Sequence, residues 1–388
     1  MRKLLEESFR AAVAAADPLQ IVAAHLPPPP KGRIFVAAAG KAAASMAVAV
    51  ERELHSVEGI AITRYGHGLP TKCIRVVEAG HPVPNETGEA AAREILSQVK
   101  RLGPDDLLLA LLSGGGSSLL ALPAPGVSMA QLKSLTGDLL RSGATIQEMN
   151  TVRKHLSAIA GGRLAAASRA PVVALIISDV VGDDPTHIAS GPCASDPTTI
   201  DDAKAILAKY RIAYDGAFSE SPKSVSARNK VIATARRSLE AAAAVFQRSS
   251  IPPIVLGDTI TGEAREVGRE QALLARETRG PAAIISGGEC TVTIEGEGGR
   301  GGRCTEFLLS LGIENPDLWA IAADTDGIDG SEDNAGAVWA PEFVRRPGAA
   351  DFLDRHDSYG FFRAAGALVM TGPTRTNVND YRAIVIPG

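Results

Sequence analysis

Residues 34–53 read IFVAAAGKAAASMAVAVERE, and this stretch decides the fold class. An apolar run ends at the turn Gly40-Lys41, and an alanine-rich segment follows it. A short apolar run bounded by glycine predicts a buried strand, and alanine favours helix. The stretch therefore predicts a strand, a turn and a helix, which is the repeating unit of an α/β protein.

The same pattern recurs along the chain. Strands are expected over residues 107–112 and 172–179, and each runs into a turn that contains glycine. Strands that are apolar throughout and alternate with helices are typical of a mainly parallel sheet covered on both faces. We also expect a helix over residues 147–167, with Gly161 and Gly162 able to stop or kink it. Its three cationic residues are interpreted as a solvent-exposed face: Arg153, Lys154 and His155.

The expected domain boundary lies near residues 211–228, which are polar and irregular. Beyond them, strands around 229–234, 254–257 and 282–286 again alternate with helices. We therefore expect an N-terminal domain over residues 1–220 and a second α/β domain over residues 221–388.

Composition excludes several classes of function. The chain has 388 residues and a formal charge of -4, so it lacks the basic excess that nucleic-acid backbones require. Its four cysteines are scattered, without the spacing of a zinc site or a disulfide framework, which fits a reducing cytoplasm. The first twenty residues have the spacing of an amphipathic helix, and no apolar run approaches the roughly 20 residues that cross a bilayer. We expect a cytoplasmic protein with neither nucleic-acid nor membrane partners.

A glycine-rich turn follows the second expected strand, in LLSGGGSSLL at residues 111–120. It is not a nucleophile elbow, because Leu119 stands at the last glycine place, and no lysine follows as in a phosphate-binding loop of the Walker A type. Free N–H groups and hydroxyls at such a turn favour an anion such as phosphate, although a tight packing turn would also use glycine. The candidate binding residues are Ser113, Gly114, Gly115, Gly116, Ser117 and Ser118.

Lys41 holds the corresponding place after the first strand. Ligands of open α/β sheets bind at the carboxyl edge of the strands, so its ammonium group is a candidate for contacting phosphate or stabilising a transition state. An ordinary surface lysine is the alternative.

Two acidic loops follow other expected strands. SDVVGDDP places Asp179 and Asp183 where carboxylates hold Mg²⁺ or accept a proton from a substrate hydroxyl, although aspartate also caps helices. DTDGIDGSEDNAG begins at Asp324, a further candidate metal ligand, although turn formation also explains its aspartates.

The loop EGEGGRGGR, residues 295–303, contains the spacing G-x-G-x-x-G at Gly296, Gly298 and Gly301. The dinucleotide fingerprint places these glycines directly between a strand and a helix, and a long loop with two arginines fits that order poorly. Arg300 and Arg303 favour another interpretation, in which planar guanidinium groups grip a carboxylate or a phosphoryl group, unless the loop is only a hairpin. His81, between glycine and proline in AGHPVP, is interpreted as structural.

Taken in order, GKAAASMA, TRYGH, EAGHPVP, LLSGGGSSLL, EMNTVRKHLSAIAGGRLA, SDVVGDDPTHIASGP, SGGE, GRGGR, AADTDGIDGSEDNAGA and TGPTRTNVND resemble the bacterial glycerate 2-kinases across nearly the whole chain. The resemblance implies an N-terminal Rossmann-like domain with a mainly parallel sheet and a C-terminal α/β domain of the MOFRL type. It also implies phosphorylation of D-glycerate at the 2-hydroxyl, with ATP and Mg²⁺, in a cleft between the domains.

The same resemblance places the family's catalytic lysine on Lys41 and its catalytic arginine on Arg303. The glycine loop would then cradle nucleotide phosphates or the substrate anion, with Arg300 and Glu306 as further binding residues. We expect Asp179 to orient the glycerate hydroxyl or hold the metal, with Asp183 and Asp324 as competitors. The sequence leaves the oligomeric state open, with a homodimer as one option.

One departure from the family pattern concerns substrate choice. Where the family reads GGRNQEF, this chain has Cys304 and Thr305 in place of the two amides. Cysteine is a weak hydrogen-bonding group, so substrate affinity would change if the amides touch substrate. Two rival functions stay open: an NAD(P)H-dependent hydroxypyruvate reductase, a label often given to this family, and a catalytically impaired glycerate- or nucleotide-binding protein.

Overall fold

The computed structural model of the chain describes residues 1–294 and 298–388. These residues form two compact units. The parallel-sheet unit comprises Pro18–Ile232, and the mixed-sheet unit combines Met1–Asp17 with Ala233–Gly388. The α/β class and the division into two domains are as predicted.

The parallel-sheet unit is built on a six-stranded sheet in the order β3-β2-β1-β4-β5-β6. The pairings of β1 with β2 and β4, of β2 with β3 and of β4 with β5 are all parallel. This order reverses between β1 and β4, the position at which open α/β sheets bind ligands. The strands are β1 (Ile34–Ala39), β2 (Val57–Arg64), β3 (Ile74–Ala79), β4 (Leu107–Leu112), β5 (Val172–Ile177) and β6 (Arg228–Ala233).

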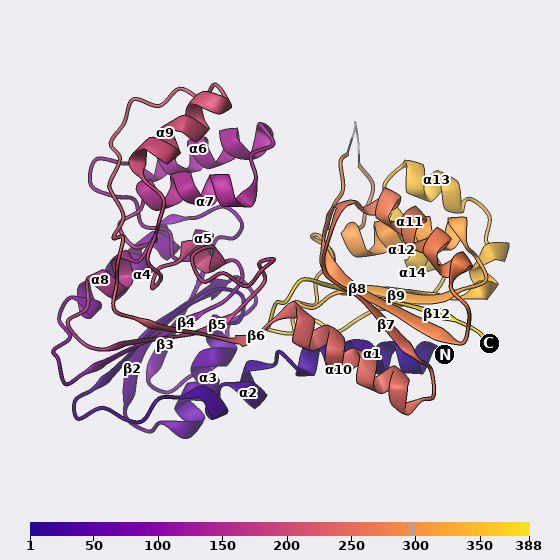
Figure 1. Cartoon of the computed structure of the whole chain (residues 1–388), viewed down its shortest axis with the longest axis horizontal. Helices are drawn as coiled ribbons and strands as arrows, with labels where there is room; N and C mark the ends of the chain where they lie inside the picture. Colours follow the sequence, from indigo (N-terminus) through magenta and orange to yellow (C-terminus); the bar gives the residue numbers. More distant parts are fainter. Residues whose placement is uncertain (295–297) are drawn as a thin grey trace. The chain divides into compact units, whose positions relative to one another are not determined.

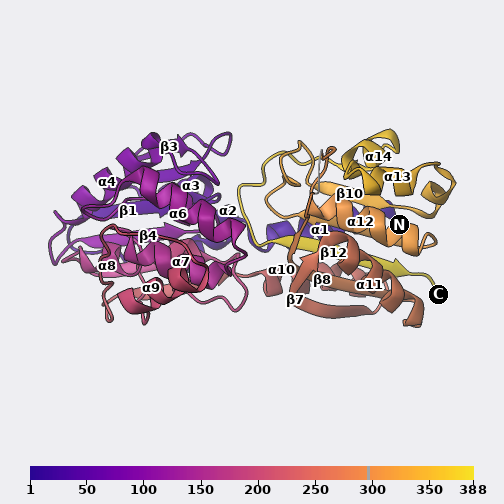
Figure 2. The same ribbon diagram turned by 90° about the horizontal axis from the view of Figure 1, so that it is seen from above.

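Helices cover both faces of this sheet, as its wholly buried central strands require (Figures 1 and 2). Figure 1 shows α3 on one face and α4, α5 and α8 on the other, while α6, α7 and α9 form a separate cluster with its own apolar core. The helices are α2 (Pro18–Ile21), α3 (Ala43–Glu53), α4 (Glu86–Val99), α5 (Gly116–Leu119), α6 (Met129–Arg141), α7 (Ile146–His155), α8 (Arg163–Ala166) and α9 (Ile200–Lys209).

The mixed-sheet unit has a six-stranded sheet in the order β11-β10-β9-β12-β8-β7. β7 and β8 pair parallel, whereas β12 runs antiparallel to both β8 and β9. Its strands are β7 (Pro253–Glu263), β8 (Ala282–Thr291), β9 (Trp319–Asp324), β10 (Gly336–Trp339), β11 (Leu368–Val369) and β12 (Asp380–Ile386). Its helices are α1 (Arg2–Ala14), α10 (Ala235–Arg248), α11 (Ala264–Glu277), α12 (Arg303–Glu314), α13 (Ala349–Asp354) and α14 (Ser358–Ala364).

Helix α1 belongs to the mixed-sheet unit, not to the domain 1–220 in which the sequence order had placed it. It packs beside α10 on one face of the sheet, with α11 and α12 on the other (Figure 1). The Phe9 ring stacks on Tyr381 at 5.9 Å between centroids, and the Tyr381 hydroxyl bonds Ser8 Oγ at 2.8 Å. The amphipathic helix was predicted correctly, but its apolar face is buried against strands more than three hundred residues away.

The expected helix over 147–167 is interrupted. α7 ends at His155, and α8 begins only after Gly161 and Gly162, which both have positive φ. The expectation that Arg153, Lys154 and His155 are a solvent face is wrong, because Lys154 is 1% exposed and His155 is 0% exposed. Within the described residues, no helix is long and apolar enough to cross a membrane.

Candidate active site

Strand register brings the sequence-predicted residues of the parallel-sheet unit to one edge. Ala39 of β1 pairs with Leu112 of β4, and Leu112 pairs with Ile176 of β5. Two residues beyond each of these stand Lys41, Gly114 and Ser178, and Asp179 is next. Because the strands are parallel, the turns that follow them emerge together at the carboxyl edge.

The turns after β1 and β4 are bonded to each other at the reversal of strand order. The Lys41 N–H donates to the Gly114 carbonyl at 2.8 Å, and the Ala42 N–H donates to Ser113 Oγ at 3.0 Å. Gly40 has a φ of +129°, and a Cβ there would lie 2.2 Å from Ser113 Oγ. Only glycine permits this approach, so the main chain at Lys41 has a fixed position relative to the glycine loop.

Gly115 is a loop position at which a side chain would be strained. Its φ is +81°, and a Cβ would lie 2.8 Å from His81 Nε2 and 3.5 Å from Lys41 Cγ. His81, which the sequence suggested was structural, therefore borders the same loop as Lys41.

The loop serines engage the chain at different points. Ser113 is fully buried, Ser118 Oγ donates to the Gly115 carbonyl at 3.1 Å, and Ser117 Oγ lies 2.8 Å from Ser190 Oγ. Ser190 in turn lies 3.1 Å from Asn150 Oδ1 of α7. Sequence reasoning assigned no role to Ser190 or Asn150, although both lie in stretches that carry the family resemblance.

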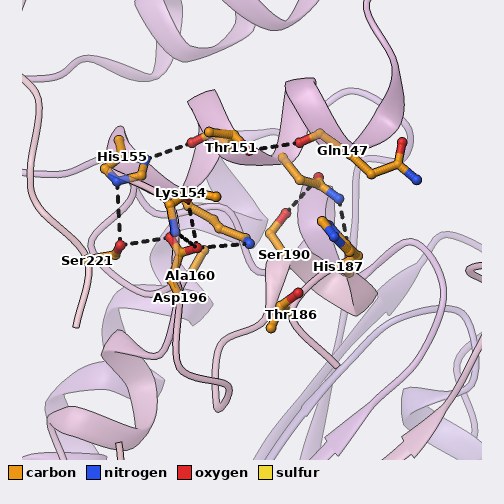
Figure 3. A network of polar contacts seen from close by, with 12 residues as sticks. Gln147, Thr151, Lys154, His155, Ala160, Thr186, His187, Ser190, Asp196 and Ser221 are labelled. Carbon is orange, nitrogen blue, oxygen red and sulfur yellow. Dashed lines mark hydrogen bonds and ion pairs between the residues drawn. The ribbon is translucent and has the colours of Figure 1, made fainter. Parts of the chain in front are cut away.

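A buried ion pair lies beside these residues (Figure 3). Lys154 Nζ is 3.3 Å from Asp196 Oδ1, and both side chains are 1% exposed. Asp196 also accepts from Ser221 Oγ at 2.7 Å and from Thr198 Oγ1 at 2.8 Å. Burial alone would raise the pKa of Asp196, but Ser221, Lys154 and Thr198 outweigh burial and lower it. The ion pair fastens α7 to the segment that precedes α9.

The acidic loop after β5 keeps Asp179 and Asp183 half-buried. Asp183 has a φ of 55°, and its N–H bonds the Val180 carbonyl at 3.1 Å. Asp184 caps its own turn by accepting from the Thr186 N–H at 2.8 Å. Asp179 stands two residues after the end of β5, and Asp183 lies four residues further along the same loop.

Arg303 lies in the mixed-sheet unit, at the first position of α12, among three carboxylates. Its Nε is 2.7 Å from Asp380, its Nη2 is 2.8 Å from Asp324, and its Nη1 pairs with Glu289. Burial alone would lower the pKa of Arg303, but the charges of Asp380, Asp324 and Glu289 raise it well above its usual value. The guanidinium group is therefore a permanent cation held by strands β8, β12 and β9.

The helix that begins at Arg303 is capped by a buried carboxylate. Asp329 Oδ1 accepts from the Cys304 N–H and Oδ2 from the Thr305 N–H, both at 2.9 Å, and Thr305 Oγ1 adds a bond of 2.7 Å. Burial raises the pKa of Asp329 to about 6, despite these bonds. Cys304 and Thr305 are both fully buried, so the departure from the family pattern concerns the packing of α12.

This cap bears on the dinucleotide fingerprint. In proteins with that motif, the pyrophosphate binds the N–H groups at the N-terminus of the helix. In α12 the N–H groups of Cys304 and Thr305 donate to Asp329 instead. Gly301 and Gly302 precede the helix directly, while Gly296 lies outside the described residues. The described part of the loop therefore does not present the anion site that the fingerprint requires.

The two remaining predicted binding residues are held by other side chains. Arg300 pairs with Glu332 and lies 4.0 Å from the Tyr359 ring centroid, on the surface. Glu306 is 2% exposed and accepts from Arg265 at 2.7 Å. Glu306 thus joins α12 to α11, and the structure does not bring it into the carboxylate cluster around Arg303.

The donor set for a metal is small. Within residues 1–294 and 298–388 there is no group of three or more His, Cys, Asp or Glu side chains that could hold an ion. Mg²⁺ in kinases commonly uses one or two carboxylates together with substrate phosphates, so Asp179 and Asp183 fit that chemistry. Asp324 fits it less well, because one oxygen pairs with Arg303 and the other accepts from the Asp326 N–H at 3.0 Å.

Known families cover most of the chain. Residues 4–226 match a domain of unknown function, DUF4147, and residues 282–380 match the MOFRL family. A putative hydroxypyruvate reductase of Agrobacterium vitis is 50% identical, over 99% of this chain and 94% of its own length. A glycerate 2-kinase of Pyrococcus horikoshii is 42% identical, over 90% of this chain and 86% of its own.

Comparison of structures points the same way. The crystal structure of a glycerate kinase from Thermotoga maritima superimposes with a TM-score of 0.88 and 36% identity, covering 99% of both chains. The structure of a Pyrococcus horikoshii protein superimposes with a TM-score of 0.81 and 37% identity.

Proposed function

The chain belongs to the glycerate kinase family, and from this we propose that it phosphorylates D-glycerate at the 2-hydroxyl. ATP is the proposed phosphoryl donor and Mg²⁺ the proposed cation. The product would be 2-phosphoglycerate.

The observation that carries the proposal is the bond between the turns after β1 and β4. It sets Lys41 beside the glycine loop at the reversal of strand order, where α/β proteins bind phosphorylated ligands. Phosphoryl transfer requires mainly positioning and neutralisation of charge. A lysine whose main chain is fixed to the loop supports both requirements.

Arg303 is the second proposed cation. Its three carboxylate partners keep it ionised at any working pH and hold the planar group in one orientation. We propose that Arg303, like Lys41, contributes positive charge that phosphoryl transfer requires.

Asp179 is the proposed base or metal-orienting residue. A carboxylate can accept the proton that the glycerate hydroxyl loses, and it can bind Mg²⁺ through oxygen. Asp183 is the second candidate ligand. Bound Mg²⁺ would neutralise phosphate charge, while the Asp179 carboxylate would orient the attacking hydroxyl.

A hydroxypyruvate reductase is the second candidate, because close relatives carry that name. Reduction needs a nicotinamide cofactor, and the described part of the glycine fingerprint precedes a helix whose first amides bond Asp329. This observation favours the kinase.

One assay separates the two activities. The purified protein is given either D-glycerate with ATP and Mg²⁺, coupled to enolase, or hydroxypyruvate with NADH or NADPH. Enolase consumes 2-phosphoglycerate and does not consume 3-phosphoglycerate. The proposal expects enolase-dependent turnover in the first reaction and no oxidation of nicotinamide in the second. The reverse result would replace the kinase with the reductase, while binding of glycerate without turnover in either would indicate the binding protein.

A further inference from the structure

Residues 189–191 form a left-handed turn in the parallel-sheet unit. Ala189, Ser190 and Gly191 have φ values of 51°, 58° and 61°. A non-glycine residue in this region costs about 1–2 kcal/mol and persists only where its surroundings enforce it. Here the Gly161 N–H bonds the Ser190 carbonyl at 2.9 Å and the Gly162 N–H bonds the Gly191 carbonyl at 2.7 Å.

The turn places two side chains against the glycine loop. The Ala189 Cβ lies 2.5 Å from the point that a Cβ on Gly116 would occupy. Ser190, which is 3% exposed, directs Oγ between Ser117 Oγ at 2.8 Å and Asn150 Oδ1 at 3.1 Å. The strained conformation thus connects the loop to α7.

The orientation of the Asn150 amide is determined by the His187 carbonyl. Asn150 Nδ2 lies 3.2 Å from that oxygen, which can only accept (Figure 3 shows His187 and Ser190 beside α7). The amide nitrogen must therefore face His187, and Oδ1 must face Ser190. Asn150 is 1% exposed, so the flipped amide would set two buried oxygens against each other at the His187 contact.

This orientation fixes the direction of the next two hydrogen bonds. Ser190 has a single hydroxyl hydrogen, and Asn150 Oδ1 can only accept it. Ser190 Oγ also lies 2.8 Å from Ser117 Oγ, and its one hydrogen cannot serve both contacts. With that hydrogen directed to Asn150, we infer that Ser117 is the donor to Ser190. The hydrogen of Ser117 is directed inward, and its lone pairs are left to accept.

We propose that Ser190 is a positioning residue that holds the Ser117 hydroxyl as a hydrogen-bond acceptor for a hydroxyl group of the substrate. The inference rests on the proposed function and gives the half-buried Ser117 side chain a partner within glycerate. A phosphate oxygen can only accept, so it is the wrong partner for a serine whose hydrogen is already donated. Anion binding in the loop is left to main-chain amides and Lys41.

The test is equilibrium binding, which does not require turnover. Calorimetry measures D-glycerate and, separately, a non-hydrolysable ATP analogue with Mg²⁺ on four variants: Ser117→Ala, Ser190→Ala, Ser190→Gly and Ser117→Ala/Ser190→Ala. Ser168→Ala is the matched control, because its Oγ also bonds a nearby carbonyl, that of Ala170, but it lies before β5 at the opposite sheet edge.

Loss of one hydrogen bond predicts roughly 3- to 10-fold weaker glycerate binding in each single variant, with nucleotide affinity unchanged. The double variant should be no worse than Ser117→Ala alone. Ser190→Gly relieves the backbone strain and Ser190→Ala retains it. Equal losses of glycerate affinity in these two variants would therefore be due to the missing hydroxyl. The control should bind both ligands as the unchanged protein does.

Two deoxy analogues identify the contact. D-Lactate lacks the 3-hydroxyl and 3-hydroxypropionate lacks the 2-hydroxyl, so one of them should bind Ser117→Ala and the unchanged protein equally well. The proposal is overturned if both analogues remain sensitive to Ser117→Ala, if the variants weaken only nucleotide binding, or if the protein does not bind glycerate. If glycerate binds and the variants show the expected losses of affinity, but no turnover occurs, the kinase proposal is refuted while the role of Ser117 in binding is supported.

Discussion

The main-chain N–H of Lys41 donates a 2.8 Å hydrogen bond to the carbonyl of Gly114. This bond joins the turns after β1 and β4, where the strand order of the parallel sheet reverses. The candidate catalytic lysine is therefore positioned by the fold of the sheet, and substitutions in the glycine loop should act on it.

Gly115→Ala should lower kcat/KM for glycerate at least tenfold. A Cβ would come 2.8 Å from His81 Nε2, so the His81 ring must shift, and at 3.5 Å from Cγ it would contact the Lys41 side chain. Gly143→Ala is the control: its φ of +76° imposes a similar strain of about 1 kcal/mol, but nothing lies within 4 Å. Equal activities for the two variants would show that the loop does not position Lys41.

Asp329 predicts a pH dependence of stability. Its pKa is raised to about 6 by burial, from 3.8, so the folded protein binds this proton more tightly than the unfolded chain. The unfolding free energy should therefore fall as pH rises from about 4 to about 6, by up to roughly 3 kcal/mol, and level off above that range.

Asp329→Asn removes this titration and should abolish that part of the slope, although the lost bonds to α12 lower stability at every pH. Both tryptophans, Trp319 and Trp339, lie in the mixed-sheet unit, so urea unfolding followed by tryptophan fluorescence reports on the relevant unit. An unchanged slope in the variant would assign the pH dependence to other groups.

Removing one partner of the Lys154–Asp196 pair should lower the free energy of unfolding far more than neutralising both partners. Lys154→Met leaves a buried carboxylate without its cation and should cost about 3 kcal/mol or more. Lys154→Met/Asp196→Asn should recover at least half of that loss. Hydrogen exchange of the α7 amides measures both effects. Lys209→Met is the control, because its pair with Glu148 is more exposed, and it should lower the free energy of unfolding by less than about 1 kcal/mol. An equally small loss for Lys154→Met would contradict the prediction.

Arg303→Met should destabilise the mixed-sheet unit by about 3 kcal/mol or more at pH 7, because Asp324, Asp380 and Glu289 lose their common cation. Arg303→Lys should lose less stability but retain little activity, since one ammonium cannot reproduce the three directed contacts. Arg269→Met, at an exposed pair with Glu266, is the control. Full activity of the lysine variant would mean that only charge is required at this position.

Strand and turn positions in the parallel-sheet unit were predictable because they depend on local patterns. The strand expected over 107–112 is β4, and the turns with Lys41 and Gly114 follow from the apolar runs that precede them. Parallel strands then bring successive turns to one edge, which is why a one-dimensional pattern located the candidate residues.

Contacts between distant segments were not predictable in this way. The periodicity of α1 predicts a helix but does not identify β12 as the strand against which it packs. Lys154 has a residue type that is usually exposed, and its partner Asp196 is 42 residues away. Asp329 lies in a loop that resembles an ordinary acidic turn, and only the fold reveals that it caps α12.

The most direct test of the central claim is the ³¹P NMR spectrum of the product formed from D-glycerate, ATP and Mg²⁺ by the unchanged protein, beside that formed by Lys41→Ala. We expect the resonance of 2-phosphoglycerate in the first sample and its loss in the second. A product phosphorylated at the 3-hydroxyl, or an undiminished yield from Lys41→Ala, would contradict it.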